Sequence, residues 1–202
     1  MPVVILVRHG DNEFVKKNLL AGRLPGVHLN DKGLHQAQQL AIYLSQAKLA
    51  GVYSSPLERT METAKPIAQA HNLEAIPKSG LLEMDYGDWQ GKSLKRLRRR
   101  KLWKTIQDKP SLAKFPRGGT FIEAQLRIVN EIKALCKAHK TKDVITCVSH
   151  SDMIKLAVAY YVNLHLDQFQ RLVVQPGSLT TLHISSCSIQ LINMNVVPDT
   201  HI

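Results

Sequence analysis

The first apolar stretch of the chain, Val3–Val7, places the strongest constraint on the fold. Its residues are all β-branched or aliphatic, and no polar residue interrupts them. A strand exposed on one face alternates apolar and polar residues, whereas a continuous apolar run is typical of a strand buried on both faces in a parallel sheet. We therefore expect Val3–Val7 to be a core strand that ends before Gly10.

Further strands are predicted in alternation with helices. The spacing of apolar residues predicts helices from residue 34, capped by Asn30 or Asp31 and ended before Gly51, and over 57–70, 121–138 and 153–162. Pro66 marks a kink or an early end in the second of these helices. Strands are predicted at 52–56, 143–148, 179–184 and 188–194. This alternation predicts one α/β domain over residues 1–202.

Residues 78–119 differ in composition from their surroundings. They are rich in glycine, basic and aromatic residues, and Pro110, Pro116 and Gly118–Gly119 interrupt them. We interpret this segment as an insertion that covers the sheet and the substrate. Within it, 95–101 reads KRLRRRK, which is typical of a solvated helix face and also fits a rim that attracts anions.

The bulk composition is that of a globular protein with an excess of positive charge. Hydrophobic residues make up 44% and charged residues 21% of the 202 residues, and no apolar run approaches the ~20 residues of a membrane span. The net charge of +11 is compatible with a nucleic acid, an anionic membrane surface or a small anionic substrate. No nucleic-acid-binding module is recognisable around the basic run, so we expect neither nucleic acid nor membrane as a partner.

The cysteines and the N-terminus bear on the cellular location. Cys136, Cys147 and Cys187 include no C-x-x-C pair and leave an odd cysteine under any pairing, so neither a zinc site nor a disulfide framework is expected. The N-terminus passes directly into the first strand without the basic segment and cleavage site of a signal peptide. We expect a cytoplasmic protein. The sequence leaves the oligomeric state open, a homodimer included.

Polar residues follow three of the predicted strands directly. These are Arg8-His9-Gly10, the segment Ser54-Ser55-Pro56-Leu57-Glu58-Arg59, and Ser149-His150-Ser151. Ligands of open α/β sheets bind outside the carboxyl ends of the strands, so these residues are expected to converge at one edge. The result would be two imidazoles and two guanidiniums in one site.

This set of side chains suits the chemistry of a phosphoryl group. Arginine offers a planar cationic fork to phosphate oxygens, and a neutral imidazole is a nucleophile. Neighbouring cations lower the pKa of His9 and so favour its neutral form, and they also stabilise charge on the phosphoryl without a metal ion. We expect no metal or cofactor. Glu83 is the candidate general acid for the leaving oxygen, ahead of Asp85.

Five segments in order resemble the histidine phosphatase superfamily, the phosphoglycerate mutase-like proteins, over nearly the whole chain. They are Arg8-His9-Gly10, residues 29–37, residues 54–59 with Thr63-Ala64, Leu82-Glu83 to Gly87 with Gly91, and Ser149-His150. The resemblance implies a three-layer sandwich with a mostly parallel central sheet flanked by helices. It also implies a phosphohistidine on His9, a phosphate pocket of Arg8, Arg59 and His150, and Glu83 as proton donor and acceptor. Substrate-binding residues are then expected among Asn12, Asn18, Gly22, Tyr86 and Ser151.

The chain differs from the common pattern of that family close to His9. Asp11-Asn12 follow Arg-His-Gly in place of an acid or Gln and then Thr or Ser, and Val15 stands where the family usually has Asn. The late motifs read Ser149-His150-Ser151 instead of Ser-His-Gly and Gly119-Thr120-Phe121 instead of Gly-Glu-Ser. We expect these differences to bear on substrate specificity.

The function predicted from these observations is hydrolysis of a small phosphorylated metabolite through phosphohistidine. One alternative is a phosphoglycerate mutase, which returns the phosphoryl to a second hydroxyl. The chain ends soon after its last predicted strand, at residues 196–202, so we expect an open site that admits water and favours hydrolysis. A second alternative is a non-catalytic module that binds a phosphorylated ligand, although such a module has no use for a general acid.

Overall fold

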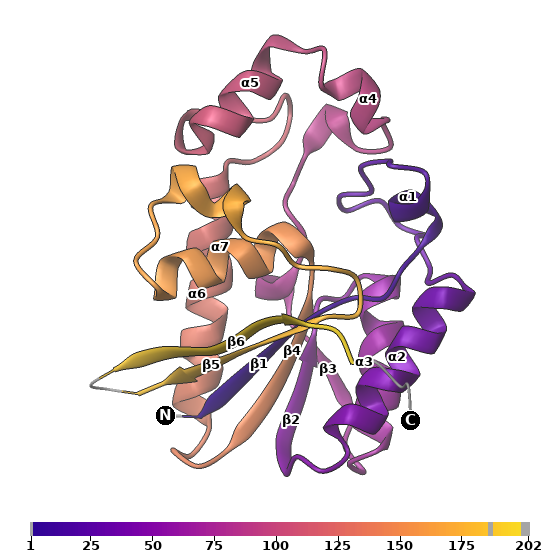
Figure 1. The fold of residues 1–202 in the computed structure, drawn as a ribbon, viewed down its shortest axis with the longest axis vertical. Helices are drawn as coiled ribbons and strands as arrows, with labels where there is room; N and C mark the ends of the chain where they lie inside the picture. Colours follow the sequence, from indigo (N-terminus) through magenta and orange to yellow (C-terminus); the bar gives the residue numbers. More distant parts are fainter. Residues whose placement is uncertain (1, 186–187, 199–202) are drawn as a thin grey trace.

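The centre of the computed structural model, which describes residues 2–185 and 188–198, is a six-stranded sheet in the order β3-β2-β4-β1-β5-β6 (Figure 1). The strands are β1 (Val3–Arg8), β2 (Leu49–Ser54), β3 (Ala75–Pro77), β4 (Val144–Ser149), β5 (Leu179–Ile184) and β6 (Ile189–Val196). β1 to β4 are mutually parallel, and β5 is antiparallel to both of its neighbours. The predicted mostly parallel sheet is confirmed.

Helices cover both faces of this sheet. They are α1 (Glu13–Lys16), α2 (Asp31–Leu44), α3 (Glu58–Gln69), α4 (Leu94–Leu97), α5 (Lys101–Asp108), α6 (Phe121–Ala138) and α7 (Ser151–Tyr161), with 3₁₀ turns at Ser79–Leu81, Gly87–Trp89, Pro110–Leu112 and Leu166–Arg171. In β1, Val4 and Leu6 join the apolar cluster under α6 and α7, whereas Ile5 and Val7 join the one under α2 and α3. The continuous apolar run of β1 is therefore explained by burial on both faces.

Several element boundaries differ from those predicted. β2 begins at Leu49, because this buried residue pairs with Val144 and Gly51 is accommodated at a register shift within the strand. α3 continues past Pro66 to Gln69, since the flanking residues Ala64 and Ile67 are buried against the sheet. The short edge strand β3 and the turn Leu166–Arg171 were not predicted, because neither has an apolar periodicity of its own.

The segment that the sequence sets apart, residues 78–119, carries α4 and α5. Figure 1 shows both helices beyond the carboxyl ends of the parallel strands. No helix among residues 2–185 and 188–198 is long and apolar enough to cross a membrane. Cys187 and the last residues of the C-terminal segment, 199–202, lie outside the described residues.

The loop after β1 is fixed by the start of α2. Asn30 caps α2 by accepting a hydrogen bond from the N–H of Gly33 at 2.9 Å, and the side chain of Gln36 accepts one from the N–H of Asp11 at 2.8 Å. A Cβ atom on Gly33 would collide with the backbone of Asp11, and one on Gly10 would collide with Gly33. The two glycines thus allow the loop after β1 to approach the start of α2 closely. This close approach holds His9, which lies between β1 and the loop, in place.

Candidate active site

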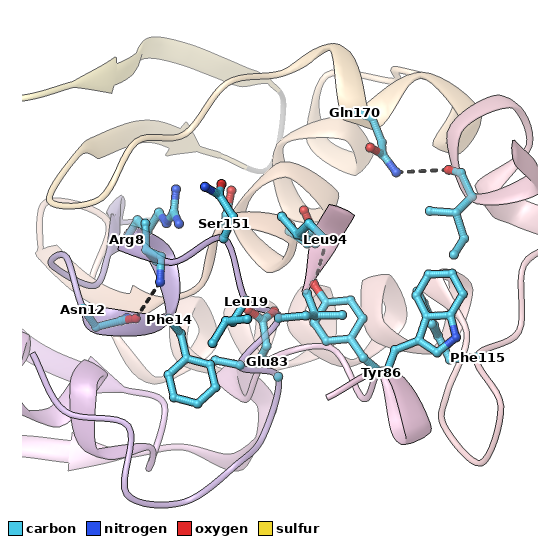
Figure 2. Close-up of a pocket in the computed structure, with 18 of the residues that line it drawn as sticks. Arg8, Asn12, Phe14, Leu19, Glu83, Tyr86, Leu94, Phe115, Ser151 and Gln170 are labelled. Carbon is cyan, nitrogen blue, oxygen red and sulfur yellow. Dashed lines mark hydrogen bonds between the residues drawn. The ribbon is translucent and has the colours of Figure 1, made fainter. Parts of the chain in front are cut away.

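A cavity of about 360 Å³ opens at the carboxyl ends of β1 and β4. Figure 2 shows Arg8, Asn12, Glu83 and Tyr86 around one space. The residues predicted for the site that line it are Arg8, His9, Asn12, Asn18, Gly22, Arg59, Glu83, Tyr86 and Ser151. His150, the remaining predicted residue, is fully buried and contacts two of them. The structure therefore brings the whole predicted set together.

His9 follows the last residue of β1 and is only 4% exposed. Its Nδ1 lies 2.7 Å from the carbonyl oxygen of Gly10, so Nδ1 is the nitrogen that donates a proton there. In the neutral ring, Nε2 is then the basic nitrogen. Burial lowers the pKa of His9 well below its ordinary value, and the charges of Arg59 and Arg8 lower it further. The ring is therefore neutral, with Nε2 able to act as a base or a nucleophile.

Two guanidiniums and an amide bring unpaired hydrogen-bond donors to His9. Arg59, at the start of α3 and 1% exposed, donates from Nη2 to the carbonyl oxygen of Gly22 at 2.7 Å, and Arg8 donates from Nη1 to that of Val174 at 2.7 Å. Nε and Nη1 of Arg59, Nε of Arg8 and Nδ2 of Asn12 have no hydrogen-bond partner among the described residues. Buried donors are rarely left unpaired, so this cluster is suited to an anion with several oxygens.

Asn12 owes its orientation to a cap. Its Oδ1 accepts a hydrogen bond from the N–H of Val15 at 3.0 Å at the start of α1, which leaves Nδ2 as the group without a partner. Asn18 lines the same wall with a left-handed backbone (φ 53°). The departures from the family pattern after His9 therefore still place amide groups at the cavity.

Glu83 also lines the cavity, is 8% exposed and accepts a hydrogen bond at Oε1 from the N–H of Met84 at 2.8 Å. Burial, and next the charge of Asp152, raise the pKa of Glu83 to about 7, although Arg59 acts against this. The backbone carbonyl of Glu83 accepts from Nε of Arg23 at 2.8 Å and from Nη2 of Arg127 at 3.0 Å. A carboxyl with such a pKa exchanges protons near neutral pH.

His150 supports the site from within the protein. Its Nε2 lies 2.9 Å from Oγ of Ser55 and its Nδ1 lies 3.2 Å from Nη2 of Arg59, an arrangement that fits a neutral ring protonated on Nε2. Burial and the charge of Arg59 lower the pKa of His150 well below its ordinary value, so its 3.7 Å contact with Oε2 of Glu83 is not an ion pair. The ring centroids of His150 and His9 are 5.3 Å apart.

Two residues of the site were not predicted from the sequence: Ser55, which lies behind His150, and Asp152, which lines the cavity. Ser55 holds His150, and Asp152 accepts a hydrogen bond from the hydroxyl of Tyr86 at 2.8 Å. Asp152 lies two positions after His150, which is the only sequence signal that points to it. Most of the remaining lining side chains are apolar, and they come largely from residues 14–21 and from the segment with α4 and α5, which also contributes Gln107.

Metal ligands are not grouped here: within residues 2–185 and 188–198, no cluster of three or more His, Cys, Asp or Glu side chains could hold a metal ion.

Comparison with known families agrees with the fold. A family described as the histidine phosphatase superfamily (branch 1) matches residues 4–197. The chain belongs to this superfamily. Relatives that are named as phosphatases support the interpretation that this chain is a phosphatase of small metabolites.

Two relatives and one solved structure illustrate the range of proteins to which this chain is similar. The chain is 27% identical over 198 residues to phosphoserine phosphatase 1 of Hydrogenobacter thermophilus, covering 97% of this chain and 93% of the relative. It is 24% identical over 188 residues to the 2,3-bisphosphoglycerate-dependent phosphoglycerate mutase of Thermoplasma acidophilum, covering 91% and 88%. Its fold matches the structure of phosphoserine phosphatase from Entamoeba histolytica in complex with 3-phosphoglyceric acid, with a TM-score of 0.87, 24% identity, and coverage of 97% and 98%.

Proposed function

We propose that this chain hydrolyses phosphate monoesters of small metabolites through a phosphohistidine on His9. The observation that carries the proposal is the cluster of unpaired donors from Arg8, Arg59 and Asn12 beside a neutral imidazole. Such a cluster would bind the phosphoryl oxygens and hold phosphorus close to Nε2. A small anionic phosphate ester is therefore the proposed partner.

The reaction then has two steps. Nε2 of His9 attacks phosphorus, the bond to the ester oxygen breaks, and the carboxyl of Glu83 gives its proton to that oxygen. Water next attacks the phosphohistidine, Glu83 takes a proton from it, and inorganic phosphate leaves with His9 restored. His150 positions Arg59 in this scheme, and its direct contact with the phosphoryl stays a prediction.

Trapping of the intermediate tests the proposal. Mixing the protein with 4-nitrophenyl phosphate and quenching in base is expected to yield a phosphoprotein that is stable in base, is lost in acid and maps to His9. Inorganic phosphate is expected to accumulate over many turnovers. A protein that releases phosphate without any acid-labile phosphoprotein would refute the intermediate, and one that releases no phosphate would refute the activity.

The two alternatives predict different products. A mutase, as in the Thermoplasma relative, would isomerise 3-phosphoglycerate without release of phosphate. A binding module would hold phosphate esters with no turnover, but a buried carboxyl whose pKa is raised to about 7 has no evident role in binding alone. Phosphate release from esters, with no isomerisation, therefore separates the proposed function from both.

The pH profile offers a test of the proton carrier. We expect kcat/KM for an alkyl phosphate to fall as the pH rises above about 7, because Glu83 must be protonated to act as the acid and its pKa is raised to about 7. The lowered pKa of His9 keeps the nucleophile neutral well below the ordinary histidine range, so His9 imposes no loss of activity there.

Asp152→Asn tests whether Glu83 causes the fall of kcat/KM at high pH, the falling limb of the pH profile. Removing the charge of Asp152 removes a contribution that raises the pKa of Glu83, so the falling limb is expected to move to lower pH. Asp108→Asn is the matched control, because Asp108 is an exposed acid paired with Lys104 on α5. A limb that stays in place in Asp152→Asn would contradict the assignment.

Three wider expectations stay predictions. The first is the cytoplasmic location, and the second is the oligomeric state, for which a homodimer is one option. The third is that residues 1–202 form a single domain with a covering insertion at about 78–119.

A further inference from the structure

The outer part of the cavity is lined mainly by apolar side chains, together with the uncharged amides of Gln107 and Gln170. The apolar side chains come from the segment that begins at α1 and from the segment with α4 and α5, and they are Phe14, Leu19, Leu20, Leu94, Trp103 and Ile106. Figure 2 shows Phe14, Leu19 and Leu94 among the side chains around the cavity. Phe14, Leu94 and Trp103 are only partly buried, so their apolar surface is open to a ligand.

Positive charge in the cavity is confined to its inner end. Among the described residues that line it, Arg8 and Arg59 are the only cationic side chains, and both lie beside His9. The other charged lining groups are the carboxyls of Glu83 and Asp152. A phosphoryl group at His9 would therefore engage both cations and leave none for a second anionic group.

Neighbouring cations do not change this balance. Arg23 and Arg127 lie near Glu83, but both donate to its carbonyl oxygen and neither lines the cavity. The basic run 95–101 also lies outside the lining, and the guanidinium of Arg98 is 5.9 Å from the ring centroid of Trp103. A carboxylate on the substrate would meet apolar side chains, uncharged amides such as those of Asn18 and Gln107, or the like charge of Asp152, and would find no cation to pair with.

We propose that the substrate carries its only anionic group at the phosphoryl and that its alcohol part is uncharged and largely apolar. This inference rests on the proposed function and deepens it. The alcohol part lies against Trp103, Leu94 and Phe14, where it removes their exposed apolar surface from water. Carboxylated esters such as phosphoserine and 3-phosphoglycerate are poor substrates, although proteins that resemble this chain are named for them or hold them.

Phosphate release from four phosphate esters of primary alcohols tests the inference. The expected kcat/KM for benzyl phosphate is about tenfold or more above that for ethyl phosphate, and about 100-fold above those for O-phosphoserine and 3-phosphoglycerate. If either carboxylated ester reacts faster than benzyl phosphate, the inference is overturned while the proposed phosphatase activity stands. If no ester releases phosphate, the proposed function fails, and the inference fails with it.

Two variants tie the preference to the cavity. Trp103→Ala is expected to bring the benzyl-to-ethyl ratio of kcat/KM to within about threefold of one. Gln107→Lys, at an exposed lining position on the same helix, adds a cation and is expected to raise the ratio of 3-phosphoglycerate to benzyl phosphate about tenfold. Lys104→Ala is the control, since this side chain is exposed on α5 and does not line the cavity. Unchanged ratios in both lining variants would overturn the inference.

Discussion

Replacing His9 with alanine is expected to lower kcat/KM for 4-nitrophenyl phosphate by about 10,000-fold or more. The substitution removes the only proposed phosphoryl acceptor, and the donors on Arg8 and Arg59 that remain can bind the ester without offering it a nucleophile. Phosphate release measured over hours would give the rate, and trapping in base would show no phosphohistidine. Substrate binding is expected to persist, because the guanidiniums stay in place.

His35→Ala is the matched control for this variant. His35 is an exposed histidine on α2, whose ring contacts the side chain of Gln39, so its loss is expected to leave the rate unchanged. Circular dichroism of both variants would establish that the fold is retained. A folded His9→Ala protein with a rate within tenfold of the unsubstituted chain would contradict covalent catalysis at His9.

The convergence of His9, Arg59 and His150 follows from sequence because parallel strands order their carboxyl ends at one edge. The apolar run of β1 and the polar residues directly after it are both visible in the sequence, and the register of β1 with β4 places Arg8 beside Ser149. The chemistry of the inner site is thus encoded within a few positions of each strand end.

The outer cavity is not encoded in this way. Leu94 and Trp103 belong to short helices whose packing depends on contacts far along the chain, such as the stacking of Trp103 on Trp89 with centroids 6.3 Å apart. Local sequence shows that this segment is basic and aromatic, but not which side chains face the cavity. Leu94, Trp103 and Ile106 do, together with Gln107, whereas the basic run 95–101 stays outside the lining. The net charge of the chain therefore does not indicate the polarity of the cavity that a substrate enters.

Glu83→Gln is expected to lower kcat/KM for benzyl phosphate by about 100-fold to 10,000-fold. The glutamine amide can still accept the hydrogen bond from the N–H of Met84, so the geometry of the wall is kept while the transferable proton is lost. Benzyl alcohol is a poor leaving group and needs that proton. Asp85→Asn is the matched control, because Asp85 is a nearby carboxyl that does not line the cavity. Asparagine can still accept the hydrogen bond that the N–H of Gly87 donates to Oδ1 of Asp85.

The same variant should separate the two steps of the reaction when the leaving group needs no proton. With 4-nitrophenyl phosphate, Glu83→Gln is expected to release one equivalent of nitrophenol in a rapid burst, because attack by His9 does not require the acid. Hydrolysis of the phosphohistidine is then slow, since no carboxylate remains to take the proton of water. Phosphoenzyme should therefore accumulate to a higher level in Glu83→Gln than in Asp85→Asn or in the unsubstituted chain. Equal loss of burst and steady state would instead indicate that Glu83 positions the substrate and carries no proton.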